Sequence, residues 1–265
     1  MQTTINLLLL AFSLPYHHCI RANIVRGRYA LIPPEGLYAN LLPEMPECTV
    51  FVLASRELGA DFSEYLVKAE NGKGTKRKFA AEEGLEAFLY VLEGEALVKC
   101  AEREYQAGPN SFVYAPPGVG LEFCSNGEQE LKALIQVHRY FSIPDAGEPA
   151  PLFGNAYHDE DVILGGQGEN PCRELIPHDL SYDWQMTVNI FGPGTHHGFI
   201  ETHLQEHGLY CLEGTASYYL SDRWIPIQKD DFLWIGPYAP HGCYCLGEKR
   251  FVYLFSKVVN RTPVL

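Results

Sequence analysis

The sequence is short of positive charge. Its 265 residues contain 20 Lys and Arg against 33 Asp and Glu, which gives a formal net charge of -13. Phosphate backbones and anionic membrane surfaces repel such a chain unless a local patch reverses the sign. The one basic run, KGTKRK at residues 73–78, is short and is expected to be a solvated loop. We therefore predict no nucleic-acid partner and no membrane partner.

The chain also lacks a cysteine framework and a long hydrophobic run. Its 8 cysteines are scattered, which favours free thiols in a reducing, cytoplasmic compartment. The apolar stretch INLLLLAFSL at 5–14 is too short to span a bilayer, and no Lys or Arg precedes it. Since only Ala22 offers a weak cleavage site, we expect residues 1–22 to be a divergent or misassigned start or a docking segment. A secretory route stays open.

Helical periodicity is nearly absent. Short alternating or β-branched and aromatic runs dominate, and Gly, Pro, Asn and Asp separate them. Examples are EAFLYVLEG (86–94), FVYAPPG (112–118), WQMTVNIFGPG (184–194) and RFVYLFS (250–256). The chain is therefore expected to be all-β.

An internal repeat organises these runs. Residues 88–118 align without a gap on residues 208–238, an offset of 120 that carries one Leu-Glu-Gly onto another. This offset is one domain length, far beyond a solenoid period. Many short antiparallel strands close best as a small barrel or jelly roll, whose narrow interior can hold one ligand or metal. We predict two tandem jelly-roll domains, at 23–148 and 149–265, joined within 144–155.

The first half has no histidine between His18 and His138, whereas the second half concentrates them in ETHLQEHGLYCLEG at 201–214. At the same offset, the first half has other residue types opposite Glu201, His203, His207 and His241, namely Ala81, Glu83, Ala87 and Leu121. Whatever chemistry the second set performs is therefore predicted to belong to the second half alone.

The spacing of this set favours a metal site. Glu201 and His203 are two apart, so on a strand both side chains leave the same face. His207 opens the returning strand after a turn, and His241 lies where a later antiparallel strand brings it inward. One carboxylate and three imidazoles suit Mn, Fe, Co, Ni or Zn. The alternative is ordinary polar residues of a β-domain. His196 and His197 are rival ligands that their Gly-flanked loop makes more typical of a rim.

The arrangement resembles the cupin signature, G-x5-H-x-H-x3-4-E-x6-G followed by G-x5-P-x-G-x2-H. Gly194 begins the first motif one residue early, and Gly214 closes it. Glu201 stands in place of the first His, His203 is the second, and His207 replaces the Glu. The second motif is degenerate and keeps Pro237 and His241.

More narrowly, the chain from about Asn23 onward is similar to the (S)-ureidoglycine aminohydrolase family, enzymes of purine catabolism with two cupin domains. The matching stretches are ALIPPEG (30–36), EAFLYVLEG (86–94), HGFIETHLQEHG (197–208), LEGTASYYLSDRWIPIQKDD (212–231) and YLFSKVVNR (253–261). The resemblance implies that the C-terminal cupin is active, binds one manganese ion per chain, and hydrolyses ureidoglycine to ureidoglycolate and ammonia.

The resemblance also implies residue roles. Metal ligation falls to Glu201, His203 and His207, and catalysis to Glu201, Tyr253 and Lys257. The predicted substrate contacts are Glu201, Tyr218, His241, Tyr253 and Lys257. Without the family, Lys257 reads equally as an exposed strand-end lysine, and the two tyrosines read as barrel-lining aromatics. The family's fourth ligand is a glutamine where this chain has His241, which leaves the exact substrate open.

Two other functions remain open at this point. One is another metal-dependent cupin enzyme, such as a dioxygenase or decarboxylase acting on a small carboxylate. The other is a non-catalytic bicupin with a vestigial site. The first half is expected to be structural and to form subunit contacts, so that the protein assembles as a homo-oligomer acting on a small-molecule substrate.

Overall fold

The computed structural model describes residues 21–158, 163–167 and 170–261. Within these ranges the chain is built of β-strands and one short 3-10 helix, η2 (Pro34–Gly36), with no α-helix. The apolar segment at 5–14 lies outside the described residues. Among those described, no helix is long and apolar enough to cross a bilayer.

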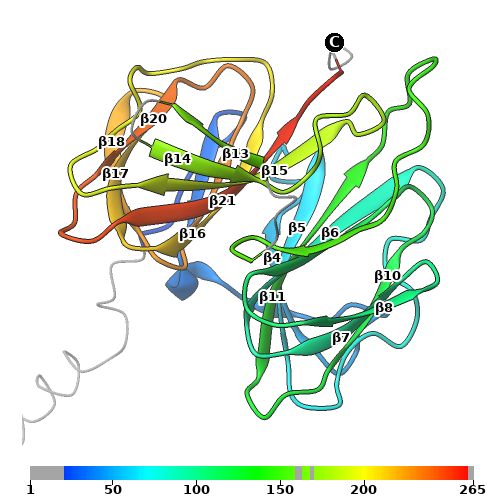
Figure 1. Ribbon diagram of the computed structural model, residues 1–265. Helices are drawn as coiled ribbons and strands as arrows, with labels where there is room; N and C mark the ends of the chain where they lie inside the picture. The colour runs from blue at the N-terminus through cyan, green and yellow to red at the C-terminus, as the bar shows by residue number, and fades with distance from the viewer. Residues whose placement is uncertain (1–20, 159–162, 168–169, 262–265) are drawn as a thin grey trace, which may run out of the picture.

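Each half pairs one large antiparallel sheet with a three-stranded sheet (Figure 1). The large sheet of the first half has the order β12 (Leu152–Asn155), β9 (Ser111–Ala115), β6 (Leu85–Glu93), β11 (Leu131–Arg139), β5 (Phe62–Ala69), β4 (Thr49–Ala54), β3 (Ala39–Asn40). Its small sheet is β10 (Leu121–Ser125), β7 (Ala96–Cys100), β8 (Arg103–Ala107).

The second half repeats this plan. Its large sheet has the order β1 (Asn23–Val25), β2 (Tyr29–Ile32), β19 (Phe232–Ile235), β16 (His207–Glu213), β21 (Phe251–Val258), β15 (Trp184–Phe191), β14 (Asn170–Glu174), β13 (Ile163–Gln167). Its small sheet is β18 (Arg223–Gln228), β17 (Thr215–Leu220), β20 (His241–Cys245). The offset of 120 residues relates the starts of β8 and β18, of β10 and β20, and of β11 and β21. The predicted all-β class with two tandem jelly-roll barrels is confirmed.

The repeated Leu-Glu-Gly marks a place where the chain needs glycine. Gly94 has a φ of 75° and Gly214 a φ of 80°, a region that side chains disfavour. A Cβ would lie 2.7 Å from the Glu130 carbonyl oxygen at the first position and 2.2 Å from that of Arg250 at the second. In both halves the strand pairing shifts register beside this glycine. The bulge lets the long central strand pass into the next hairpin.

Side-chain alternation divides the core into three layers. On β6, Ala87 and Leu89 point into the first barrel, whereas Phe88 and Tyr90 point at the other half. The large sheets of the two halves pack face to face through this second set, in which the Phe88 and Trp184 rings lie 6.1 Å apart. We call this shared buried face the interdomain layer. The second barrel has its own apolar interior, to which the predicted site residues Tyr218 and Tyr253 belong.

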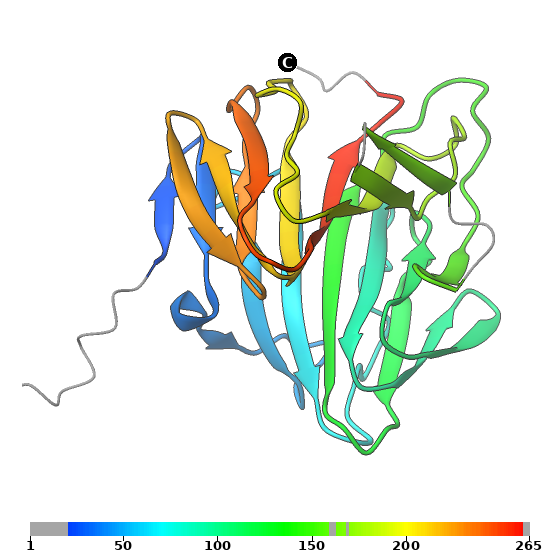
Figure 2. The ribbon, with the colours of Figure 1, turned by 60° about the vertical axis from the view of Figure 1, so that its left-hand side comes forward.

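Three strands belong to the large sheet of the half on the other side of the predicted boundary between residues 148 and 149. β2 pairs with β19 of the second half, and β12 pairs with β9 of the first. Figure 2 shows the blue N-terminal strands lying beside the orange strands of the second half. Arg21, just before β1, binds the buried Asp231 carboxylate through two hydrogen bonds of 2.7 Å. The limits 23–148 and 149–265 stay a prediction: the large sheet of the second half includes β1 and β2 from before the boundary, and that of the first half includes β12 from after it.

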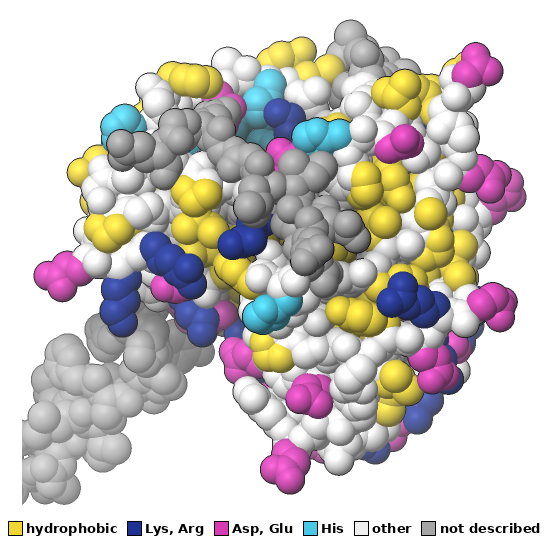
Figure 3. All heavy atoms as spheres, in the orientation of Figure 1, with side chains coloured by type: hydrophobic (Ala, Val, Ile, Leu, Met, Phe, Trp, Pro, Cys, Tyr) yellow, Lys and Arg dark blue, Asp and Glu magenta, His cyan; other side chains and the backbone are white. Residues whose placement is uncertain are grey.

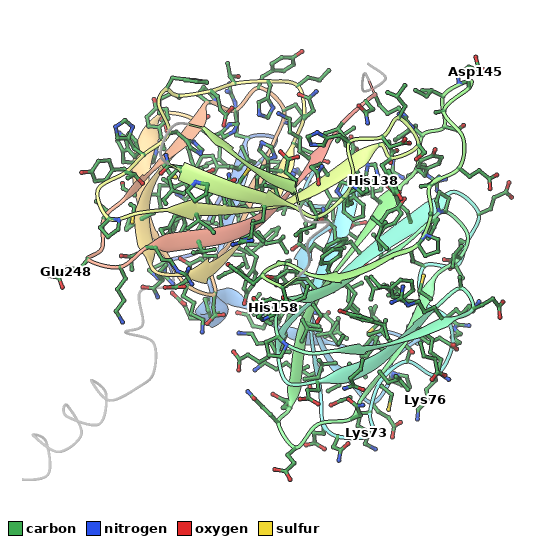
Figure 4. All side chains as sticks on the ribbon, viewed as in Figure 1. Lys73, Lys76, His138, Asp145, His158 and Glu248 are labelled. Carbon is green, nitrogen blue, oxygen red and sulfur yellow. The ribbon has the colours of Figure 1, made fainter. Side chains whose placement is uncertain are left out.

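The basic run lies at the end of the first half that is far from the second (Figure 4). Lys73 Nζ is 2.7 Å from Glu47 Oε1, and Lys76 also contacts Glu47. Both lysine side chains are exposed. The run is thus a solvated loop in which carboxylates offset the charge. Free thiols, as expected, occur at Cys48, Cys100, Cys124, Cys211, Cys243 and Cys245.

Candidate metal centre

The predicted metal ligands enter the second barrel from two strand starts and one loop. His207 is the first residue of β16, and His241 is the first residue of β20, both as predicted. The expected strand carrying Glu201 and His203 is wrong. Glu201 makes only an isolated antiparallel bridge to His241, and residues 202–206 form a loop. The loop, rather than strand alternation, turns His203 toward the others.

The same bridge corrects the comparison of the halves. In the first half the residue bridged to Leu121 is Phe79, by the same reciprocal pair of backbone hydrogen bonds that joins Glu201 to His241. Phe79, and not Ala81, is therefore the counterpart of Glu201. The gap-free repeat begins only at β6, and two residues are added in the first half before it. The conclusion that the first half lacks these ligands is unchanged.

Three imidazoles converge, and backbone carbonyls fix their tautomers. The Nδ1 atoms of His203, His207 and His241 lie 2.8, 2.7 and 2.9 Å from the carbonyl oxygens of Gln205, Ser256 and Ala239. A carbonyl can only accept, so each Nδ1 carries the proton and each Nε2 keeps a lone pair. This is how metal-binding histidines are normally held.

The freed lone pairs face one another. His203 Nε2 and His207 Nε2 are 3.2 Å apart, and His241 Nε2 is buried without a hydrogen-bond partner among the described residues. One ligand atom from each of these histidines lies within 4.8 Å of the others. Two acceptors at such a distance repel unless a cation lies between them, and nitrogens sharing a metal at about 2.1 Å have this spacing. The three side chains therefore fit a metal ion.

Burial keeps the imidazoles neutral. It lowers the pKa of His203, of His207 and of His241, and the positive charge of Lys257 adds to the effect. The pKa of His207, which is fully enclosed, falls well below the usual value. A neutral imidazole is the form that binds a metal.

Glu201 lies at the edge of the triad. Its Oε1 is 3.6 Å from His241 Nε2 and 3.9 Å from His197 Nδ1, and 29% of its side chain is exposed. The carboxylate thus faces both the imidazoles and the open space of the barrel. It can complete a ligand set or handle a proton.

A cavity of about 630 Å³ leads to these residues. Figure 3 shows imidazole side chains gathered beside a Lys or Arg side chain in a hollow near the upper edge of the view. The cavity is lined by all the predicted site residues, including Tyr218, Tyr253 and Lys257. Burial raises the pKa of both tyrosines well above the usual value, so both hydroxyls stay neutral donors. Among the described residues Lys257 forms no ion pair, which leaves its ammonium available.

The sequence reasoning did not name Asn189 in this cavity, and it placed His197 at the rim. His197, expected at the rim, has a side chain only 13% exposed and places Nε2 3.2 Å from Tyr253 Oη. Asn189 donates from Nδ2 to the same hydroxyl at 2.9 Å. Period-two alternation along 184–191 could have found Asn189, because Gln185 also lines the cavity. His196 is exposed and stacks on Tyr244, outside it.

Comparison with known proteins decides the family. The Cupin domain model matches residues 188–257. The (S)-ureidoglycine aminohydrolase of Escherichia coli (strain K12) is 33% identical over 242 residues, which are 91% of this chain and 92% of that protein. The chain belongs to the (S)-ureidoglycine aminohydrolase family. A probable member from Oryza sativa subsp. japonica is 29% identical over 92% of this chain and 77% of its own length.

Solved structures agree with this family assignment. The crystal structure of protein Ylba from E. coli has a TM-score of 0.84 at 31% identity and covers 93% of this chain and 97% of its own. A putative glyoxylate induced protein from Pseudomonas aeruginosa has a TM-score of 0.84 at 27% identity, with 95% of each chain covered. Bacillus subtilis oxalate decarboxylase, at 11% identity and a TM-score of 0.66, shares the two-cupin fold alone. The aminohydrolase family consists of hydrolases that act on C–N bonds.

Proposed function

We propose that this protein is a metal-dependent hydrolase that releases ammonia from (S)-2-ureidoglycine and forms (S)-ureidoglycolate. The observation that carries the proposal is the convergence of three neutral imidazole Nε2 atoms in a cavity that also contains a carboxylate and an ammonium. The family assignment supplies the substrate class.

The metal ligands in this proposal are Glu201, His203, His207 and His241, holding one Mn²⁺ per chain. A bound divalent ion would supply Lewis acidity toward substrate or water oxygen. Imidazole and carboxylate ligands also suit Fe, Co, Ni and Zn, so metal analysis of the purified protein identifies the ion. The first half is proposed to be structural, in a cytoplasmic homo-oligomer.

Ureidoglycine has a carboxylate, an amine and a urea group on one carbon, and the cavity offers a partner for each kind of group. Lys257 is proposed to pair with the carboxylate by a charge-assisted hydrogen bond. The Tyr253 hydroxyl, held by Asn189 and His197, and the Tyr218 hydroxyl can donate to the urea oxygen. These contacts would fix which face of the reacting carbon meets water.

Glu201 is proposed to move the proton. Hydrolysis adds the elements of water: the C–N bond to the amine breaks, a C–O bond forms, and a proton goes from the water oxygen to the departing nitrogen. A partly exposed carboxylate beside neutral imidazoles can accept that proton and return it to the amine, which leaves as ammonia.

The test is ammonia release from freshly prepared ureidoglycine, by the metal-free and Mn²⁺-loaded protein. We expect release with Mn²⁺ and little without. His203→Ala should abolish both bound metal and ammonia release, whereas His196→Ala, which changes an exposed imidazole outside the cavity, should leave both intact.

Full activity of metal-free His203→Ala would refute the proposal. The Mn²⁺-loaded wild type could instead release no ammonia from ureidoglycine, and consume dioxygen or release carbon dioxide with another small carboxylate. That result would favour a different cupin reaction. Absence of any bound Mn, Fe or Zn in the purified protein would favour a binding protein with a vestigial site.

A further inference from the structure

The first half contributes none of the proposed ligands at His203, His207 and His241, yet it reaches the proposed metal centre through the interdomain layer. Gln136 lies in the middle of β11, in the first half, and its side chain is buried. Its Nε2 donates to Ser256 Oγ of β21, in the second half, at 2.9 Å. Both residues are buried, so water does not replace this hydrogen bond and its loss is costly.

Ser256 in turn holds a ligand. Its carbonyl oxygen accepts the Nδ1–H of His207 at 2.7 Å, the bond that directs His207 Nε2 at the other imidazoles. Its hydroxyl accepts the Gly208 backbone N–H at 3.1 Å, next to His207 in the chain. The Gln136 side chain thus fixes a residue that sets both the tautomer and the backbone position of His207.

The interface leaves little room for His207 to adjust. A Cβ on Gly208 would lie 2.5 Å from Glu64 Oε2, so the first half packs directly against the backbone beside the ligand. Glu64 is the β5 residue paired with Gln136. On the other side of the ligand, Glu206 Oε1 accepts the Asp61 backbone N–H at 2.6 Å, again across the interface. Its Oε2 accepts the Trp234 indole N–H at 2.6 Å.

We propose that the first cupin has become a positioning scaffold for the metal centre, in which Gln136 acts through Ser256 to hold His207 in its metal-binding orientation. Gln136 and Ser256 are positioning residues and do not touch substrate. The inference rests on the proposed metal site, and it explains how a half that lacks ligands contributes to the chemistry of the other.

The experiment measures Mn²⁺ affinity of metal-free full-length protein by calorimetric titration. Gln136→Met keeps the length of the side chain and removes the donor, and Ser256→Ala removes its acceptor. Loss of a residue that orients a ligand typically weakens metal binding 10- to 100-fold. We expect Gln136→Met to raise the Kd about 10-fold, Ser256→Ala at least as much, and the double variant no more than Ser256→Ala, because Gln136 acts through Ser256.

Tyr140→Phe is the matched control. Tyr140 Oη also donates one hydrogen bond across the interface, to the Ser181 carbonyl at 2.9 Å, but it contacts none of the proposed ligands. It should lower the thermal midpoint about as much as Gln136→Met and leave the Kd unchanged.

An unchanged Mn²⁺ Kd in Gln136→Met would overturn the inference, as would equal weakening in Tyr140→Phe or additive effects in the double variant. The proposed function fails separately, if the wild type itself binds no Mn²⁺ or releases no ammonia.

Discussion

Lys257 carries a charge that acts on all three imidazoles of the cluster. Its positive charge lowers the pKa of His203, His207 and His241, after the larger effect of burial, and its ammonium has no carboxylate partner among the described residues. A cation kept unpaired beside a polar cavity is costly unless a ligand supplies the anion. This supports a substrate that brings its own carboxylate.

Replacing Lys257 by Met should therefore raise KM more than it lowers kcat. Hydrogen bonds to charged groups contribute about 1.5–3 kcal/mol, so we expect kcat/KM to fall about 10- to 100-fold. Steady-state kinetics of ammonia release check this. Lys249→Met, at an exposed position before β21, is the control and should match the wild type. A lower kcat with unchanged KM would place Lys257 in the chemical step.

His241 is the residue at which this chain departs from the family resemblance, and we expect it to affect which metal the proposed site prefers. Imidazole nitrogen favours Zn, Ni and Fe, whereas amide and carboxylate oxygens favour Mn. Replacing His241 with Gln should shift the ratio of Mn²⁺ to Zn²⁺ affinity toward Mn²⁺ by about tenfold or more, as measured by competition with a chelator. An unchanged ratio would mean that His241 is not a ligand.

Site residues could be predicted where a metal-binding residue type occurs at a spacing that brings it to the same barrel. His203, His207 and His241 stood out because the other half lacks histidine at the matching positions, and the structure brings them together. His197 was expected only at the rim, because its contact with the Tyr253 hydroxyl forms when the loop before Glu201 folds. Asn189 was missed although it lies opposite Tyr253 in the pairing of β15 with β21. Loop packing places His197, and strand pairing places Asn189.

At the scale of elements, the strand and hairpin pattern was readable because the turns that end β6 and β16 require the same glycine. The prediction of a strand at Glu201 was wrong. The sequence there alternates as a strand does, but the segment forms only one backbone bridge, from Glu201 to His241. The 201–206 segment forms its hydrogen bonds through side chains and isolated contacts. Propensity gives no signal for such a segment.

The glycine at the end of β6 should be intolerant of any side chain. In Gly94→Ala the new Cβ would meet the Glu130 carbonyl at 2.7 Å in addition to a φ of 75°, and we expect a loss of about 3 kcal/mol or more in the free energy of unfolding. Gly118, at a φ of 76° with no atom within 4 Å of a Cβ, is the control. Gly118→Ala should cost only about 1 kcal/mol. Urea denaturation measures both, and equal losses would remove the role assigned to the contact.

At the scale of the whole molecule, the interdomain layer contains a buried polar cluster around His138 (Figure 4). Glu86 accepts hydrogen bonds from Tyr114 Oη at 2.5 Å and has Oε1 2.9 Å from His138 Nδ1. Asp183, from the second half, accepts the Phe141 N–H at 2.7 Å. Burial raises the pKa of the Glu86 and Asp183 carboxyls to about 7 each, so this pair holds a proton that the unfolded chain would release.

The contribution of the Glu86 and Asp183 carboxyls to the free energy of unfolding should therefore fall as pH rises. A folded pKa near 7, above unfolded values near 4, means that the folded state binds more protons between these limits. The free energy of unfolding then falls by up to about 1.4 kcal/mol per pH unit for each such proton. Burial lowers the pKa of His138 and acts in the opposite direction, so the comparison must isolate the carboxyls.

The measurement is the free energy of unfolding of metal-free protein between pH 4 and 8. The advantage of the wild type over Glu86→Gln should shrink as pH rises, because glutamine cannot lose the proton. Glu128→Gln, at an exposed position, should show no pH-dependent difference. A difference between wild type and Glu86→Gln that stays constant with pH would argue that Glu86 does not titrate in this range.

Topology was predictable as a duplication but not in its connections. The repeat preserved strand spacing from β6 onward, which the alignment detects directly. The pairing of β2 with β19 joins short segments about 200 residues apart, and no local pattern encodes such a partner. Sheet edges are therefore the part of this fold that sequence periodicity leaves undetermined.

Because the two halves exchange edge strands, neither barrel is complete without the other half of the chain. If the chain were split at its linker, the first fragment would carry away β1 and β2 and uncover β19, while the second would carry away β12 and uncover β9. Each fragment would then expose an unpaired sheet edge, which is prone to non-native strand pairing. This exchange ties each barrel to the other half of the chain, which is a structural reason for the first half to persist although it contributes none of the proposed ligands around His203, His207 and His241.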